Sequence, residues 1–228
     1  AGDREATMVD EYLSEREQAE QLRRWLRENW IWLVAGVVLT LAAYYGYRWW
    51  EARAAARSVA AGERFEAMLE AIASGKREDG LEIAAEVTGE YADTPYADQA
   101  TLVLSRLDVD SGNYAAAEAK LAKVASGSRD PELRTVARLR LARVQLAQGR
   151  YDAALATLDE AATPAIEARV LELKGDVLLA KGDAAGALDH WRSAEAAATA
   201  DPGGAGAQVD AELLRLKIDE VSARTGEK

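Results

Sequence analysis

The sequence of 228 residues contains no cysteine, a single histidine and a single phenylalanine. Without cysteine the chain has no disulfide framework, no thiolate nucleophile and no thiolate ligand for zinc, and it fits a reducing or an oxidising compartment equally well. The chain also has no run of β-branched residues long enough to indicate a sheet. Apolar residues instead recur at helical spacing between short Gly, Asp and Pro breaks, so the predicted fold class is all-α.

Residues that carry catalysis are equally scarce. His190 has no second imidazole or thiol to work with, and Ser193 on the same predicted helix is weak evidence for a nucleophile. Gly75-Lys76 lacks the upstream glycine of a phosphate loop, and carboxylate pairs such as Asp108 and Asp110 are expected by chance in so acidic a chain. We predict a non-catalytic protein without metal, cofactor or small-molecule substrate, in which His190 is a surface or packing residue.

The charge balance is negative, with a formal net charge of −11. Residues 51–228 carry 22 basic and 31 acidic side chains, a net charge of −9. Such a surface repels phosphate backbones, so we expect no nucleic acid partner.

One long uncharged run stands out. Asn29 to Tyr47 is 19 residues without a charge, and as a helix it spans roughly 28 Å, close to the ~30 Å hydrocarbon thickness of a bilayer. Aromatic residues gather at both of its ends, where amphipathic rings prefer the headgroup region, and Arg27 and Arg48 flank it. We therefore predict a transmembrane anchor over residues 29–50, with the lipid bilayer as a partner.

A cleavable signal peptide is the main alternative, because arginines precede the run and Ala54-Ala55-Ala56 has the A-x-A pattern. The apolar run is longer than the roughly 7–15 residues of a secretory core region, and bulky residues at 48–51 separate it from the alanines. An uncleaved anchor is favoured. Met8 is one candidate for the native start, with residues 1–7 then added before it.

Charge does not choose the orientation of the anchor. Lysine and arginine within ~15–20 residues of a span set topology, and here each side has four. The arginines are Arg16, Arg23, Arg24 and Arg27 on the amino side, and Arg48, Arg53, Arg57 and Arg64 on the carboxyl side.

Two features of the amino-terminal half suggest contacts with the membrane. Residues 18–28 place Leu22 and Trp25 opposite Arg23 and Arg24, as in a helix at the membrane surface, although a plain extension of the spanning helix fits equally well. Within the anchor, small residues line two helical faces, one with Gly36, Thr40 and Ala43 and one with Ala35, Ala42 and Gly46, and can pack against another transmembrane helix or simply face lipid. The candidate packing residues are Gly36, Thr40, Ala43 and Gly46.

A repeat organises the carboxyl part. Three glycines, Gly112, Gly149 and Gly182, lie 37 and 33 residues apart, with a small residue seven before each, Ala five after and a large apolar residue nine after. These positions are occupied in turn by Ser105, Ala142 and Gly175, by Ala117, Ala154 and Ala187, and by Leu121, Leu158 and Trp191. Two antiparallel helices per unit explain the pattern, because small residues let the helices approach and Gly permits the tight turn.

The pattern resembles the tetratricopeptide repeat, a helix pair with a period near 34 residues. The middle unit, RLRLARVQLAQGRYDAALATLDEAA, matches best, whereas Ala184 and Lys174 depart from the pattern in the last unit. Gly75 heads a fourth, weaker unit. After the break at 201–206, a final helix is expected to cap the solenoid with Val209, Leu213, Leu214, Leu216 and Ile218.

In tetratricopeptide domains the first helix of each pair lines the concave face. By register, the groove candidates are Gln99, Arg106, Val136, Arg143, Arg169 and Asp176. Arginines in an acidic domain can hold a carboxylate or an acidic partner segment. Solvated faces with i,i+4 charge pairs are the alternative.

The order of parts resembles the YfgM family, ancillary subunits of the SecYEG translocon. The resemblance covers nearly the whole chain, and is carried by QAEQ at 18–21, GYRWW at 46–50, LRLARVQ at 139–145 and LKI at 216–218. It implies a bacterial inner-membrane protein with residues 1–28 in the cytoplasm and residues 51–228 as a periplasmic repeat domain. It also implies work beside SecYEG and the membrane-anchored chaperone PpiD.

The function we expect is a membrane-anchored scaffold at the translocon that binds chaperones or emerging clients. A holdase chaperone, or a regulator of a signalling protein that acts independently of translocation, is the alternative.

Overall fold

The computed structural model describes residues 2–203 and 209–226, and every regular element within these ranges is a helix. The elements are α1 (Gly2–Ala73), α2 (Arg77–Glu90), α3 (Pro95–Asp110), α4 (Tyr114–Gly127), α5 (Pro131–Ala147), α6 (Tyr151–Ala161), the short 3₁₀ helix η1 (Pro164–Ile166), α7 (Glu167–Lys181), α8 (Ala184–Ala200) and α9 (Ala211–Thr225). The prediction of an all-α fold is confirmed.

The chain forms two compact units, Ala1–Ala56 and Arg57–Lys228. Helix α1 runs through both and ends at Ala73, beside the predicted stop at Ser74-Gly75. Within its part from Leu22 to Ala73, an 18-residue stretch reaches a mean hydropathy of 1.5, and this helix is the one described segment long and apolar enough to cross a membrane. The predicted lead-in and the predicted anchor thus belong to the same helix.

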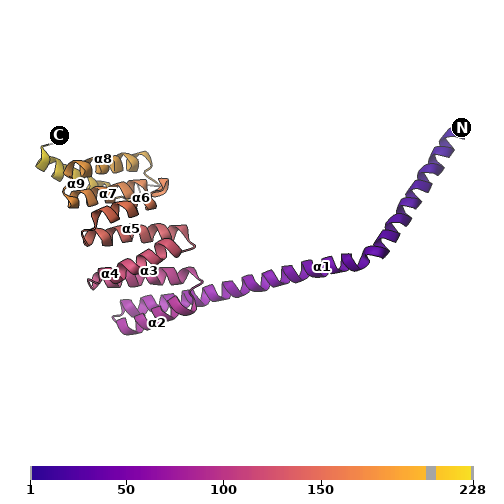
Figure 1. The fold of residues 1–228 in the computed structure, drawn as a ribbon, viewed down its shortest axis with the longest axis horizontal. Coiled ribbons are helices and arrows are strands. Elements are labelled where there is room, and N and C mark those ends of the chain that lie inside the picture. Colours follow the sequence, from indigo (N-terminus) through magenta and orange to yellow (C-terminus); the bar gives the residue numbers. More distant parts are fainter. Residues whose placement is uncertain (1, 204–208, 227–228) are drawn as a thin grey trace. The chain divides into compact units, whose positions relative to one another are not determined.

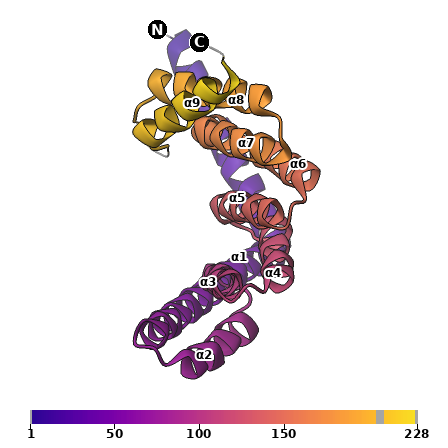
Figure 2. The same cartoon turned by 90° about the vertical axis from the view of Figure 1, so that its left-hand side faces the viewer.

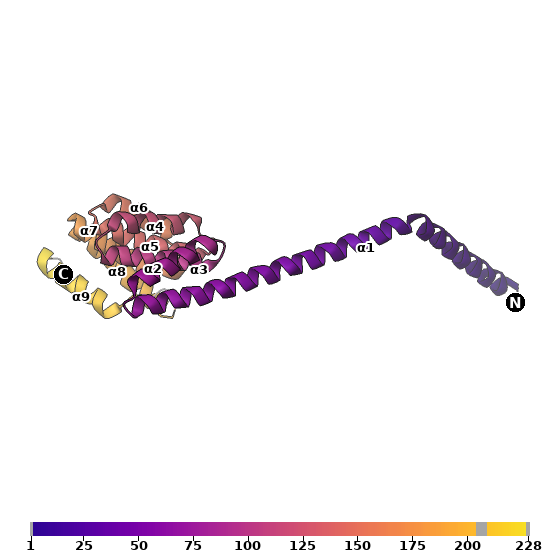
Figure 3. The same ribbon diagram turned by 90° about the horizontal axis from the view of Figure 1, so that it is seen from below.

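The second unit is a stack of helix pairs in chain order (Figure 1). The carboxyl end of α1 packs with α2, and the following pairs are α3 with α4, α5 with α6 and α7 with α8. The first helices α3, α5 and α7 lie next to one another, with α4 and α6 to the other side (Figure 2). Seen along the stack in Figure 3, the pairs overlie one another. This is the solenoid that the repeat predicts.

Each helix pair turns at a glycine in the left-handed region. Gly75, Gly112, Gly149 and Gly182 have φ between 72° and 95°. At each turn the next residue donates its N–H to a carbonyl five residues back, as Asn113 does to Asp108 at 2.8 Å. This is the Schellman arrangement, in which only glycine avoids a steric cost at the turn residue. The predicted turn positions are confirmed.

The small and large residues of the repeat form the core of each pair. Ala117, Ala154 and Ala187 are fully buried, and so are the large residues that follow them four positions later in each unit. The smallest residue on a first helix matches the largest on a second helix, because Gly175 lies against the indole of Trp191. A methyl group at Gly175 would overlap that ring.

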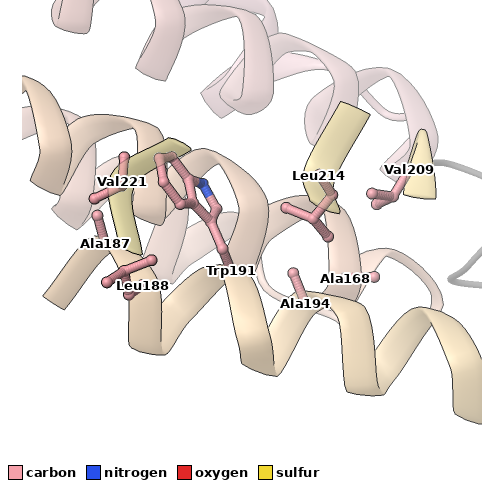
Figure 4. Packing of buried hydrophobic residues seen from close by; sticks show 8 residues of the cluster. All are labelled: Ala168, Ala187, Leu188, Trp191, Ala194, Val209, Leu214 and Val221. Carbon is pink, nitrogen blue, oxygen red and sulfur yellow. The ribbon is translucent and has the colours of Figure 1, made fainter. Parts of the chain in front are cut away.

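Helix α9 closes the last pair. Figure 4 shows Trp191 rising from α8, with Val221 of α9 to one side and Leu214 to the other. Val209 is buried in the same cluster and Ile218 packs against it. The expected cap is therefore present, but Leu213 and Leu216, which the sequence placed on its apolar face, are exposed.

An ion-pair network also fixes the cap. Lys217 Nζ on α9 lies 3.0 Å from Glu172 Oε1 and 2.8 Å from Asp176 Oδ1, both on α7. Glu172, whose side chain is 4% exposed, also pairs with Arg169, and the Trp191 indole N–H donates to the Glu172 carbonyl at 3.1 Å. Burial alone would lower the pKa of Lys217, but the hydrogen bonds to Asp176 and Glu172 outweigh it and raise the pKa.

Two glycine-to-alanine changes are expected to act in opposite directions. Gly175→Ala forces the buried indole of Trp191 to move and should destabilise the fold by about 1–3 kcal/mol. Gly89→Ala, at a helical position with open space around it, should stabilise the fold by up to about 1 kcal/mol. Thermal unfolding of the full chain in detergent micelles, followed by circular dichroism, measures both. Equal midpoints for the two variants would contradict the proposed packing.

Removing the Lys217 ammonium should loosen the cap. Lys217→Met is expected to cost about 2 kcal/mol, less than the 3–5 typical of a fully buried pair, because Lys217 is partly exposed and Arg169 still neutralises Glu172. Arg215→Met, on the same helix as Lys217, breaks a more exposed ion pair with Glu195 of α8; it is the matched control and should leave the unfolding midpoint near that of the parent chain. If the two variants unfold alike, the network does not hold α9.

Candidate functional site

A groove opens in the repeat stack between α3 and α5. It has a volume of about 280 Å³, and residues of α4 also line it. The lining residues are Ser105, Arg106 and Val109 of α3, Tyr114 and Leu121 of α4, and Arg140, Arg143, Val144 and Ala147 of α5. We call this the α3–α5 groove.

The α3–α5 groove combines an apolar floor with cationic walls. Leu121 and Val144 are buried beneath it. Among the residues that the structure describes, the Arg140 guanidinium donates only to the Leu102 carbonyl, at a long 3.4 Å. Arg143 has no hydrogen bond or ion pair with any residue that the structure describes. Arg106 lies 3.9 Å from Asp110, but its side chain is 80% exposed, so this pair contributes little.

The surroundings of the walls disfavour positive charge, although Arg140 and Arg143 are both exposed to solvent. Loss of hydration lowers the pKa of Arg140, and repulsion from Arg106 lowers it further. The same loss of hydration lowers the pKa of Arg143, with repulsion from Arg169 next and partial relief from Glu172 and Asp176. Both groups stay protonated, because arginine titrates far above neutral pH. An anion in the groove would relieve this repulsion.

The six residues predicted to line a groove fall into different environments. Arg106 and Arg143 come together in the α3–α5 groove. Val136 lines a separate hollow between α5 and the η1 segment. Arg169 and Asp176 belong to the Lys217 network, and Gln99 is partly exposed on α3.

The sequence prediction missed Arg140. This residue lies nine positions before the turn glycine of its unit, where the neighbouring units have Val103 and Leu173. Leu173 is buried in its unit, whereas Arg140 points its charge to the groove wall. An arginine at a position that is apolar in the other repeats was the available indication.

The candidate packing residues of the anchor lie within the Ala1–Ala56 unit, and all of them are exposed. The Thr40 hydroxyl donates to the Gly36 carbonyl at 2.8 Å. A methyl group added at Gly36 or at Gly46 would meet nothing within 4 Å. Packing inside the described chain therefore does not require either glycine.

His190 is half-buried on α8, and its Nδ1 lies 2.9 Å from the Gly186 carbonyl of the preceding turn. Ser193 likewise donates back along its own helix, to Asp189 at 2.8 Å. Over residues 2–203 and 209–226, no group of three or more His, Asp or Glu side chains is placed to hold a metal ion. Within the described chain, neither residue is arranged with the other for proton transfer.

Comparison with known proteins extends these observations. Residues 23–223 match the family model of the tetratricopeptide repeat-like domain. The ancillary SecYEG translocon subunit of Escherichia coli K12 is 33% identical over 92% of this chain and 98% of its own length. The proteins of the same name from Neisseria gonorrhoeae and Haemophilus influenzae are 30% and 25% identical, with the same coverage of both chains. The chain therefore belongs to the family of ancillary SecYEG translocon subunits, the YfgM family, which carries a tetratricopeptide repeat-like domain.

Proposed function

We propose that this chain is a non-catalytic, membrane-anchored scaffold at the SecYEG translocon, which it links to periplasmic chaperones such as PpiD and to emerging clients. The observation that carries the proposal is the extent of the similarity. The three relatives, each named an ancillary SecYEG translocon subunit, match 92% of this chain and 98% of their own lengths, so the match includes both the apolar helix and the repeats. A repeat solenoid presents an extended concave surface suited to binding proteins.

Tethering is the mechanism we propose. An anchor over residues 29–50 confines the repeats close to a membrane-embedded partner and raises their effective concentration there. Weak contacts in a groove then suffice for specific association. The proposed partner-binding residues are those predicted from the register, with Arg106 and Arg143 in the α3–α5 groove as the principal pair.

Site-specific crosslinking tests this function. A photoreactive residue at Gly36 and another at Arg143 should give adducts with SecYEG subunits or PpiD in native membranes, identified by mass spectrometry. A photoreactive residue at Arg192, exposed on α8 outside the α3–α5 groove, is the control for the second position. Adducts only with signalling proteins, or only with a second copy of the chain, would contradict the translocon assignment.

The proposed localisation places residues 1–28 in the cytoplasm and residues 51–228 in the periplasm of the inner membrane. Because the chain has no cysteine, single cysteines report topology without a background. A membrane-impermeant maleimide should label Ser126→Cys in intact spheroplasts, because Ser126 is exposed on α4. Ser14→Cys should react only after lysis. Labelling in the reverse order would overturn the orientation.

The anchor is proposed to pack against another transmembrane helix through Gly36, Thr40, Ala43 and Gly46. A glycine inside a helix is about 0.5–1 kcal/mol less favourable than alanine, and no contact within the described chain offsets this cost at Gly36 or Gly46. Close approach of a second helix would offset it.

Bulky substitutions should break that packing. Gly36→Leu and Gly46→Leu are expected to lower recovery of SecYEG subunits with the tagged chain by about fivefold, equivalent to roughly 1 kcal/mol of lost helix contact. Val38→Leu, on the face opposite Gly36, is the matched control. Recovery that is unchanged in the glycine variants would show that these residues face lipid.

A further inference from the structure

The middle repeat has a charged residue at one position where its neighbours are apolar. Where the flanking units have Val103 and Leu173, it has Arg140, whose guanidinium group lies on the wall of the α3–α5 groove. Over residues 2–203 and 209–226, the Arg140 side chain makes a single long hydrogen bond, to a backbone carbonyl. This side chain is exposed, and within the described residues it has no carboxylate partner.

Arginines without carboxylate partners are unexpected in a region with 31 acidic and 22 basic residues. Other cations of the stack do find partners, as Lys174 does with Asp159 and Arg150 with Glu118, both at 2.5 Å. Arg140 and Arg143 point instead into a shared space, and Arg106 closes its third side. Arg106 repels Arg140, and Arg140 repels Arg143, so an anion among them would relieve the repulsion.

The volume and lining of the groove limit what can occupy it. At about 280 Å³ it lies below the ~300–1,000 Å³ of small-molecule pockets. The floor, made by Val109, Leu121 and Val144, requires an apolar group to replace water. A bulky apolar side chain with carboxylates beside it can contact the apolar floor and pair with the arginines of the walls. A free inorganic anion would pair with the arginines but leave water against the floor.

We propose that the α3–α5 groove binds an extended segment of a partner protein in which a bulky apolar residue is flanked by Asp or Glu, with Arg140 as a specificity-determining residue. The inference rests on the proposed scaffold function and names the chemistry of the partner. The net negative charge of the region repels an acidic segment at long range, so recognition depends on contacts inside the groove. The affinity is accordingly modest, as a tethered contact permits.

Peptide binding to the full chain in detergent micelles tests the inference. The probe is a fluorescein-labelled peptide GSEELEEGS, compared by anisotropy with GSQQLQQGS, which lacks the charges, and with GSEESEEGS, which lacks the apolar side chain. The first peptide should bind at least tenfold more tightly than either of the others. Equal binding of all three would overturn the inference.

Variants of the chain separate the groove from the rest of the surface. Arg140→Leu restores the apolar character of the neighbouring repeats, and so should fold normally while losing at least tenfold in affinity for GSEELEEGS. Arg143→Gln should show the same loss. Arg192→Gln removes an exposed arginine outside the groove and is expected to bind like the parent chain. Retained affinity in Arg140→Leu and Arg143→Gln, with helicity unchanged, would overturn the assignment.

A parallel measurement distinguishes failure of this inference from failure of the scaffold function. The photoreactive residue at Gly36 is placed in the Arg140→Leu chain and in the parent. Translocon adducts together with no preference for the acidic peptide would overturn the groove assignment alone. A clear peptide preference without translocon adducts would overturn the scaffold function alone. Self-association that Arg140→Leu abolishes, measured by sedimentation, would show that a second copy occupies the groove and would overturn the partner segment.

Discussion

The close approach of the two helices in each pair is the constraint on which the rest of the repeat stack depends. A small residue on the first helix faces a large one on the second, and the match is tightest where Gly175 meets Trp191. The approach is possible only because the chain reverses within two or three residues, and the left-handed glycines make that reversal. Close approach of the paired helices therefore requires both the glycine turn and the matched core residues, which explains why the two recur together in the sequence.

This arrangement leaves the groove arginines outside the core. The core clusters join three successive helices, α3 with α4 and α5 in one and α5 with α6 and α7 in the next, and Arg106, Arg140 and Arg143 belong to neither, so these arginines can vary without harm to the fold. The last pair is the exception. There Lys217 of the cap bonds to Glu172 and Asp176 on α7, so the corresponding positions hold the end of the solenoid together. Partner recognition is consequently expected at the middle of the stack rather than at its capped end.

The sequence alone predicted the helices, the turns and the registers because each depends on residues within about 40 positions that repeat. It did not predict that the six groove candidates lie in different environments. Arg143 and Asp176 hold equivalent positions in their units, yet only Asp176 meets Lys217, which is 41 residues away and belongs to no repeat. The exposure of Leu213 and Leu216 was missed for a related reason, because the apolar pattern of α9 does not show which face α8 covers.

Charge has different consequences over the whole chain and within the α3–α5 groove. Over the whole chain, the net charge of −11 favours solubility and disfavours phosphate backbones. Within the α3–α5 groove, the relation is reversed, because Arg140 and Arg143 stay cationic in surroundings that lower the pKa of each. An acidic segment is attracted by the arginines of the groove, whereas the rest of the acidic surface repels it. A tether that holds partners nearby removes the need for long-range attraction. The negative net charge of the chain and the positive charge of the groove together favour a weak but chemically selective contact.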